Sequence, residues 1–214
     1  MMFLGNRQSI IFDLRDEMIF LGVSVLGEII WIVTVGFAPR NTSGRNTAAG
    51  QVADELNITG IYSIVRHPLY VGNFFMWLGP VLFLRSVWFT IIFGLVYWLY
   101  YERIMFAEEQ FLRRKFGEVY DRWSEKVKAF IPFRVKFVRP KLGFSVRNVL
   151  KREYNSFVNI FLIFTILDLV RNFILSGRIF MTEIWMWLLI GAAGIWLIVR
   201  SIHKYTKWLE VEGR

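Results

Sequence analysis

Five long apolar blocks, separated by short polar or charged stretches, constrain the fold of this chain more than any other feature. They cover residues 18–38, 68–84, 87–101, 157–175 and 184–199 of the 214-residue sequence. A helix needs roughly 20 apolar residues to cross a hydrocarbon core of ~30 Å, and the blocks reach or approach that length. An open strand or coil would leave backbone groups unsatisfied in lipid. We therefore predict an all-α polytopic membrane protein with about five transmembrane helices.

The sequence indicates a single membrane domain with five successive regions. These are an N-terminal region with the first helix (1–38), a loop (39–66), a catalytic hairpin core (67–133), a basic interfacial segment (134–156) and a C-terminal helix pair with its tail (157–214). No small-residue cleavage site follows the first block, so we expect a retained helix and not a signal peptide. The chain has no cysteine, which excludes disulfides and thiolate metal ligands, and we expect no metal.

Basic residues are distributed unevenly around these blocks. Of the 26 Lys and Arg, 21 lie in residues 39–66, in residues 102–154 or after the last block, and only 5 lie on the other side. The positive-inside rule then places both long segments and the C-terminus in the cytoplasm. The formal net charge of +9 follows from this bias and suits contact with anionic lipid headgroups. It does not indicate a nucleic-acid partner, which would need a soluble basic face.

The second and third blocks form a hairpin with polar side chains at both open ends. The residue before a proline avoids the α region and proline suits the first helical turn, so Arg66 and His67 should lie extended before Pro68. About 17 residues carry the chain up roughly 25 Å, and the next helix returns Glu108 and Glu109 to the level of His67. Taken singly, these side chains fit ordinary roles as interface anchors or helix-surface ion pairs. Together they indicate a pocket for a cationic, polar cofactor at the headgroup level.

The order of these residues resembles the isoprenylcysteine carboxyl methyltransferase and phospholipid methyltransferase superfamily of integral-membrane enzymes. The matching residues are Gly60-Ile61-Tyr62, Arg66-His67-Pro68-Leu69-Tyr70-Val71-Gly72, Glu108-Glu109-Gln110-Phe111-Leu112, Phe116-Gly117 with Tyr120, and Phe130-Ile131-Pro132. The match covers roughly residues 50–133, and neither end of the chain is part of it.

The resemblance implies S-adenosylmethionine as the methyl donor. The residues that it places around this cofactor are Asp54, Glu55, Leu56, Asn57, Tyr62, His67, Pro68, Leu69, Tyr70 and Glu108. Arg66, Arg103 and Glu109 form the candidate catalytic set, with one of the two arginines as the anchor of an anionic acceptor by bidentate contact. Positioning of donor and acceptor in line can supply much of the acceleration, and an ionised acceptor needs no general base.

We therefore expect a membrane methyltransferase that acts on a lipid or another amphiphilic acceptor entering from the bilayer. The expected location is a bacterial inner membrane, with the active site facing the cytoplasm. The acceptor group stays open between a lipid phosphate, a phospholipid amine and a prenyl-cysteine carboxylate, as does the oligomeric state. A membrane NADPH-dependent sterol-type reductase is the first alternative, because such enzymes also carry a histidine-proline motif near a hydrophobic hairpin. A non-catalytic membrane scaffold or small transporter is the second.

Three features lie outside the hairpin. Asp168 and Arg171 are three residues apart in the fourth block, where an intrahelical ion pair competes with a functional role. Glu28 interrupts the first block and is expected to face the bundle, toward an arginine of the hairpin. Residues 133–153 carry seven Lys and Arg among apolar residues, which predicts an amphipathic interfacial segment or, more specifically, a site that recruits an anionic lipid headgroup.

Overall fold

The computed structural model describes residues 13–39, 42, 45–47, 50–133 and 136–213, and most of these residues are helical. The elements are α1 (Leu14–Phe37), β1 (Arg45–Thr47), β2 (Gly50–Val52), η1 (Ile61–Ser63), α2 (Pro68–Phe83), α3 (Val87–Phe116), α4 (Glu118–Lys126), α5 (Val146–Ser176) and α6 (Glu183–Tyr205). The two three-residue strands pair in an antiparallel register with Asn46 opposite Gln51. The five apolar blocks correspond to α1, α2, α3, α5 and α6.

Four of these helices, α1, α3, α5 and α6, are long and apolar enough to cross a membrane. α2 has 16 residues and is therefore about 24 Å long, somewhat less than the hydrocarbon core. Large apolar side chains of α3 face outward, with Trp88 77% and Val87 73% exposed, as expected for a lipid-facing helix. The prediction of a helical, multi-pass membrane protein is confirmed: the described residues contain four helices of spanning length and one shorter apolar helix, where we expected about five spans.

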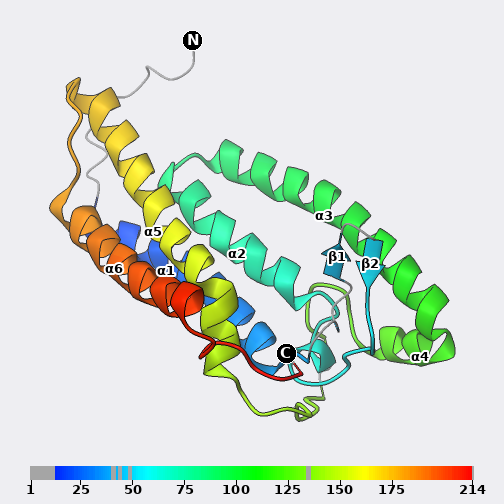
Figure 1. The fold of residues 1–214 in the computed structure, drawn as a ribbon. Helices are drawn as coiled ribbons and strands as arrows, with labels where there is room; N and C mark the ends of the chain where they lie inside the picture. The colour runs from blue at the N-terminus through cyan, green and yellow to red at the C-terminus, as the bar shows by residue number, and fades with distance from the viewer. Residues whose placement is uncertain (1–12, 40–41, 43–44, 48–49, 134–135, 214) are drawn as a thin grey trace.

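The helices α1, α2, α5 and α6 lie side by side, whereas α3 diverges from α2 and continues into α4 (Figure 1). The end of α1, the start of α2, the end of α3, the start of α5 and the end of α6 all lie toward the same end of the molecule. We call this the loop end, because the segments that follow α1, α3 and α6 meet there. The charge distribution predicted that these basic segments share one side of the membrane.

The α1–α2 contact is close because small residues face each other. A Cβ atom on Gly27 would lie 2.5 Å from the Gly72 carbonyl oxygen, so only glycine fits there. Pro80 lies inside α2 and has no N–H for the Met76 carbonyl, which therefore needs another donor. The Ser24 hydroxyl donates to that carbonyl at 2.8 Å. This contact replaces the missing helical bond and fixes α2 along α1.

A buried charge network joins α1, α5 and the start of α6 at the end opposite the loop end. Arg171 forms ion pairs with both Glu17 and Asp168. The Trp185 indole donates to Glu17 at 2.8 Å, and the Thr182 backbone N–H and hydroxyl each donate to Asp168 at 2.8 Å. Every charge in this network has partners, so the Asp168–Arg171 pair fits an ion pair that stabilises the fold better than a functional site.

Glu28 does face the bundle, but the expectation of an arginine partner is wrong. One carboxylate oxygen of this buried residue accepts a hydrogen bond from the Ser156 hydroxyl of α5 at 2.9 Å. The same hydroxyl lies 3.7 Å from the Met76 sulfur. Ser156 therefore links α1, α2 and α5. It lies 128 residues after Glu28, and the sequence did not indicate this contact.

Candidate active site

The motif before α2 is held by backbone contacts to the segment after α4. The Gly60 N–H donates to the Val138 carbonyl at 2.8 Å, and Val138 N–H donates to the Ser63 hydroxyl at 2.9 Å. Gly60 has a φ of 61°, and a Cβ atom there would approach the Pro140 ring at 3.1 Å, so a glycine is required. The chain therefore turns sharply at Gly60 and enters η1, and hydrogen bonds to Val138 hold both Gly60 and Ser63.

Arg66 and His67 lie outside the helix, as the following Pro68 predicts. Their N–H groups donate to the carbonyls of Lys128 and Ala129 at 2.9 and 3.1 Å, in place of helical bonds. His67 has φ −122° and ψ 61° and precedes the first residue of α2. Both side chains are thereby directed from a fixed backbone, which orients them toward the returning helix α3.

Glu109 of α3 binds both of these side chains. Its Oε1 atom accepts from Arg66 Nη2 at 2.8 Å, from Arg66 Nε at 3.0 Å and from His67 Nε2 at 2.9 Å. Arg66 Nη1 donates to the carbonyls of Ser124 and Val127 at 2.7 and 3.2 Å. The Arg66 side chain is only 16% exposed, and these hydrogen bonds connect the start of α2 to α3 and to the end of α4.

Glu108 has different partners from its neighbour. Its Oε2 atom accepts from the Tyr70 hydroxyl at 3.0 Å, and His67 Nδ1 lies 3.6 Å from the same oxygen. The Tyr97 hydroxyl donates to the Tyr70 carbonyl at 2.6 Å, and the Tyr97 ring stacks on Tyr101 with centroids 4.1 Å apart. A row of aromatic side chains therefore supports the carboxylate of Glu108 from the side of the bilayer.

His67 controls the net charge of this cluster. Burial acts to lower the pKa of His67, but hydrogen bonds and charges from Glu108 and Glu109 outweigh it, so the pKa is raised above its ordinary value. With His67 neutral, one arginine and two carboxylates leave a net charge of −1, and protonation of His67 cancels it. Burial and the charge of Glu109 also raise the pKa of Tyr120, which keeps this phenol protonated.

The loop predicted to line the cofactor lies between β2 and η1. Leu56 packs on the buried cluster of Ala53, Leu112 and Tyr120, which fixes the loop against α3 and α4. The Asn57 side chain accepts from the backbone and hydroxyl of its near neighbour Thr59 at 3.2 and 3.1 Å. Two further loop residues have exposed side chains: Asp54, and Glu55, whose carboxylate accepts from Lys141 at 3.3 Å. Tyr62 follows in η1 and is buried.

Arg103 lies apart from the cluster that contains Arg66. It precedes Glu108 by five residues, which is roughly 140° around a helix at 100° per residue. Its side chain is exposed, and within the described ranges no carboxylate pairs with it. The structure therefore joins Arg66, but not Arg103, to the glutamate pair.

Phe130 is an aromatic residue near the cluster for which the sequence indicated no role. The Phe130 ring lies 6.1 Å from Phe74 of α2 and 6.0 Å from Trp98 of α3, between centroids. It therefore occupies the region where α2 and α3 diverge, next to the row of tyrosines. Its place in the Phe130-Ile131-Pro132 motif was the available signal, although helix periodicity could not show which way it points.

The fold and these contacts define a multi-pass membrane protein with a polar, aromatic-lined cluster at one membrane face. Residues 18–119 match the model of the phospholipid methyltransferase family. The chain is 42% identical over 81 residues to the protein-S-isoprenylcysteine O-methyltransferase of Schizosaccharomyces pombe, covering 37% of this chain and 34% of that one. It is 31% identical over 114 residues to protein-S-isoprenylcysteine O-methyltransferase B of Arabidopsis thaliana, covering 53% and 57%.

A third relative has a different name. The nickel-cobalt-cadmium resistance protein NccN of Alcaligenes xylosoxydans xylosoxydans is 36% identical over 84 residues, which cover 39% of each chain. The matched regions span from about a third to somewhat more than half of these relatives' lengths. No solved structure gives a significant match. Residues 18–119 are thus similar to the phospholipid methyltransferase family, and the similarity to the curated isoprenylcysteine O-methyltransferases agrees with the motifs.

Proposed function

We propose that this protein is a membrane methyltransferase that uses S-adenosylmethionine and acts on an amphiphilic acceptor. The observation that carries the proposal is the contact between the two halves of the motif. Glu108 and Glu109 of α3 meet His67 at 3.6 and 2.9 Å, inside the region that matches the family. The printed names of several relatives, protein-S-isoprenylcysteine O-methyltransferase, support the reaction class.

The cluster has the charge that this cofactor needs. S-adenosylmethionine carries a sulfonium, an ammonium and a carboxylate, and when bound it supplies an electrophilic methyl group. Glu109 is neutralised by Arg66, so Glu108 is the carboxylate that would hold a cationic group of the donor. The hydrogen bond from Tyr70 orients Glu108 for this task. The residues proposed to line the rest of the cofactor are Asp54, Glu55, Leu56, Asn57, Tyr62, His67, Pro68 and Leu69.

The two arginines take different roles in this proposal. Arg66 already donates to Glu109 and to two carbonyls, so it positions the carboxylate and does not touch the acceptor. Arg103 is exposed on α3 at the level of the membrane surface and is the candidate to bind an anionic acceptor group. A carboxylate acceptor is ionised at neutral pH and needs no general base, so alignment of the reacting atoms supplies the acceleration.

The acceptor would reach the cluster from the bilayer. α2 and α3 diverge toward the loop end (Figure 1). The Phe130 ring contacts Phe74 of α2 and Trp98 of α3. An acyl or prenyl chain can pack on these aromatic side chains while its polar group stays at the headgroup level. We favour the carboxylate of a prenylated cysteine, with a lipid phosphate or amine as the alternatives. The basic loop end supports an active site facing the cytoplasm. The bacterial inner membrane stays our proposed location.

A methyl-transfer assay tests this proposal. The full chain in nanodiscs is incubated with S-adenosylmethionine labelled in its methyl group, together with a prenylated cysteine or a total lipid extract. We expect a labelled product with one added methyl group, and much less product from the Glu108→Gln variant when the donor concentration is below saturation. Exposed Glu102 of the same helix provides the matched control, Glu102→Gln. A melting temperature raised by NADPH but not by S-adenosylmethionine would instead favour the reductase.

A further inference from the structure

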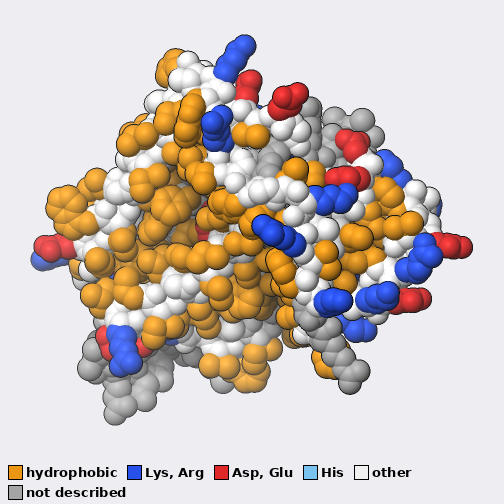
Figure 2. Space-filling view, turned by 90° about the horizontal axis from the view of Figure 1, so that it is seen from below, with side chains coloured by type: hydrophobic (Ala, Val, Ile, Leu, Met, Phe, Trp, Pro, Cys, Tyr) orange, Lys and Arg blue, Asp and Glu red, His pale blue; other side chains and the backbone are white. Residues whose placement is uncertain are grey.

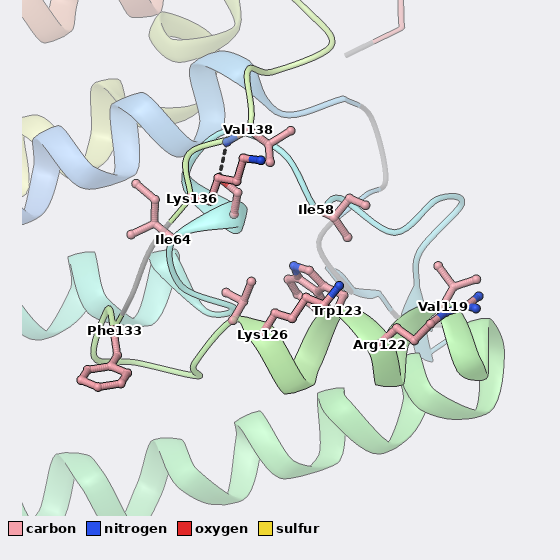
Figure 3. Close-up of a pocket in the computed structure, with 11 residues that line it drawn as sticks. Ile58, Ile64, Val119, Arg122, Trp123, Lys126, Phe133, Lys136 and Val138 are labelled. Atoms are coloured by element: carbon pink, nitrogen blue, oxygen red, sulfur yellow. Dashed lines mark hydrogen bonds between the residues drawn. The ribbon is translucent and has the colours of Figure 1, made fainter.

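A second pocket lies next to the candidate active site and shares none of the side chains of the Arg66, His67, Tyr70, Glu108 and Glu109 cluster. Its volume is about 660 Å³ (Figure 3). One wall is the face of α4 that carries Val119, Arg122, Trp123 and Lys126, at i, i+3, i+4 and i+7 spacing. The other wall comes from Ile58, Ser63, Ile64, Phe133, Lys136 and Val138. The segment that carries the motif is therefore exposed to a separate cavity on this side.

The pocket lining combines positive charge with apolar surface. Among the described residues that line it, Arg122, Lys126 and Lys136 are charged, and none is Asp or Glu. None of the three cations forms an ion pair with a carboxylate in the described part of the chain. Most of the remaining lining is apolar and includes the Trp123 and Phe133 rings. A cavity of this kind suits a ligand with an anionic group joined to an apolar part.

The position of the pocket indicates where such a ligand comes from. α4, which forms one wall, lies at the loop end, beyond the membrane-crossing part of α3 (Figure 1), and the face in Figure 2 carries Lys and Arg side chains together with Asp and Glu. Exposed apolar side chains flank it, with Ile131 74%, Phe133 61% and Phe137 59% exposed. Cations next to apolar side chains at a membrane surface are attracted to anionic lipids.

We propose that this pocket binds the headgroup of an anionic phospholipid from the surrounding leaflet. Arg122, Lys126 and Lys136 contact the phosphate, and Trp123 and Phe133 pack on the glycerol and the first part of an acyl chain. The basic segment between α4 and α5 would then bind one lipid at a defined site, in addition to its general electrostatic attraction to the anionic membrane surface. This site is independent of methyl transfer and would exist even if the proposed reaction were wrong.

Binding of short-chain, water-soluble lipids to the purified full chain tests this proposal. The probes are dihexanoyl phosphatidic acid and dihexanoyl phosphatidylcholine, and native mass spectrometry or a melting-temperature titration gives the affinity. The test variant is Arg122→Gln/Lys126→Gln, and the charge-matched control is Arg114→Gln/Lys207→Gln, which removes two exposed cations outside the pocket. Each cation near the surface contributes about fivefold, so we expect roughly 25-fold weaker phosphatidic acid binding in the test variant.

Three outcomes would overturn the proposal. Equal losses in the test and control variants would mean general surface attraction. Unchanged binding in the test variant would mean that the lipid binds elsewhere. Glycerol 3-phosphate binding as tightly as phosphatidic acid would mean that the apolar lining contributes nothing. The single variant Lys136→Gln, in a different segment, repeats the test with an expected fivefold loss if the α4 double variant does not fold.

Discussion

Neutralising each glutamate of the adjacent pair separately should produce two different defects. Glu109 Oε1 receives Arg66 Nη2, Arg66 Nε and His67 Nε2 within 2.8 to 3.0 Å, and its side chain is 17% exposed. Hydrogen bonds to charged groups contribute roughly 1.5–3 kcal/mol each. Glutamine keeps one acceptor oxygen, and Arg66 keeps its two carbonyl partners, so we expect Glu109→Gln to cost about 2–3 kcal/mol. For a chain of this length that lowers the melting temperature by roughly 4–12 °C.

Glu108→Gln should leave the melting temperature nearly unchanged, because glutamine still accepts from the Tyr70 hydroxyl. Two unit charges about 4 Å apart attract by ~4 kcal/mol at an effective dielectric constant of 20, part of which is lost to desolvation. We therefore expect S-adenosylmethionine to bind about 10- to 100-fold more weakly, which is ~1.4–2.8 kcal/mol.

Thermal unfolding in detergent, with and without S-adenosylmethionine, measures both effects in one experiment, and Glu102→Gln on the same helix serves as the control. The reasoning is refuted if Glu108→Gln destabilises the protein as much as Glu109→Gln while donor affinity stays the same. It is also refuted if Glu109→Gln has the melting temperature of the unmodified chain, because the contacts of Glu109 with Arg66 and His67 would then not stabilise the protein.

Three further changes have definite expected results. Donor affinity should rise as pH increases through the pKa of His67, which is raised above its ordinary value. In the donor-free protein, protonated His67 contributes stability that is complete below the ordinary pKa of about 6.5 and is lost as pH rises through the raised pKa. Donor binding and thermal unfolding measured at several pH values check both expectations, and a flat profile contradicts them. Arg171→Met should cost about 3–5 kcal/mol, since it leaves two buried carboxylates unpaired; if unfolding in denaturant shows a loss below 1 kcal/mol, the network is not structural. Ser24→Ala should cost about 1–3 kcal/mol, because the carbonyl that Pro80 leaves without a donor loses its partner; an unchanged melting temperature would show that another group replaces the hydroxyl.

Much of the architecture could be predicted because helix length and proline chemistry are local properties. The return of Glu108 and Glu109 to the level of His67 follows from a helix, a short turn and a second helix. Even the separation of Arg103 from Glu108 could have been predicted from 100° per residue. These predictions used no information about the rest of the chain.

The remaining contacts depend on how distant segments meet. Arg66 donates to the carbonyls of Ser124 and Val127, which any residue type at those positions would supply. The partner of Glu28 is a serine on a helix 128 residues later, and nothing in either local sequence marks the pair. Backbone acceptors and long-range packing leave no pattern in one sequence, so these features required the structure.

The backbone carbonyls that hold Arg66 and His67 have a consequence for the order of assembly. Four of them, from Ser124, Val127, Lys128 and Ala129, lie about sixty residues after the side chains and N–H groups that they bind. Synthesis proceeds from the N-terminus, so α2 and α3 are complete before these acceptors exist. A nascent chain that ended before Ser124 would contain every charged side chain of the cluster without these supports. The candidate active site is thus completed only after the membrane hairpin has been made.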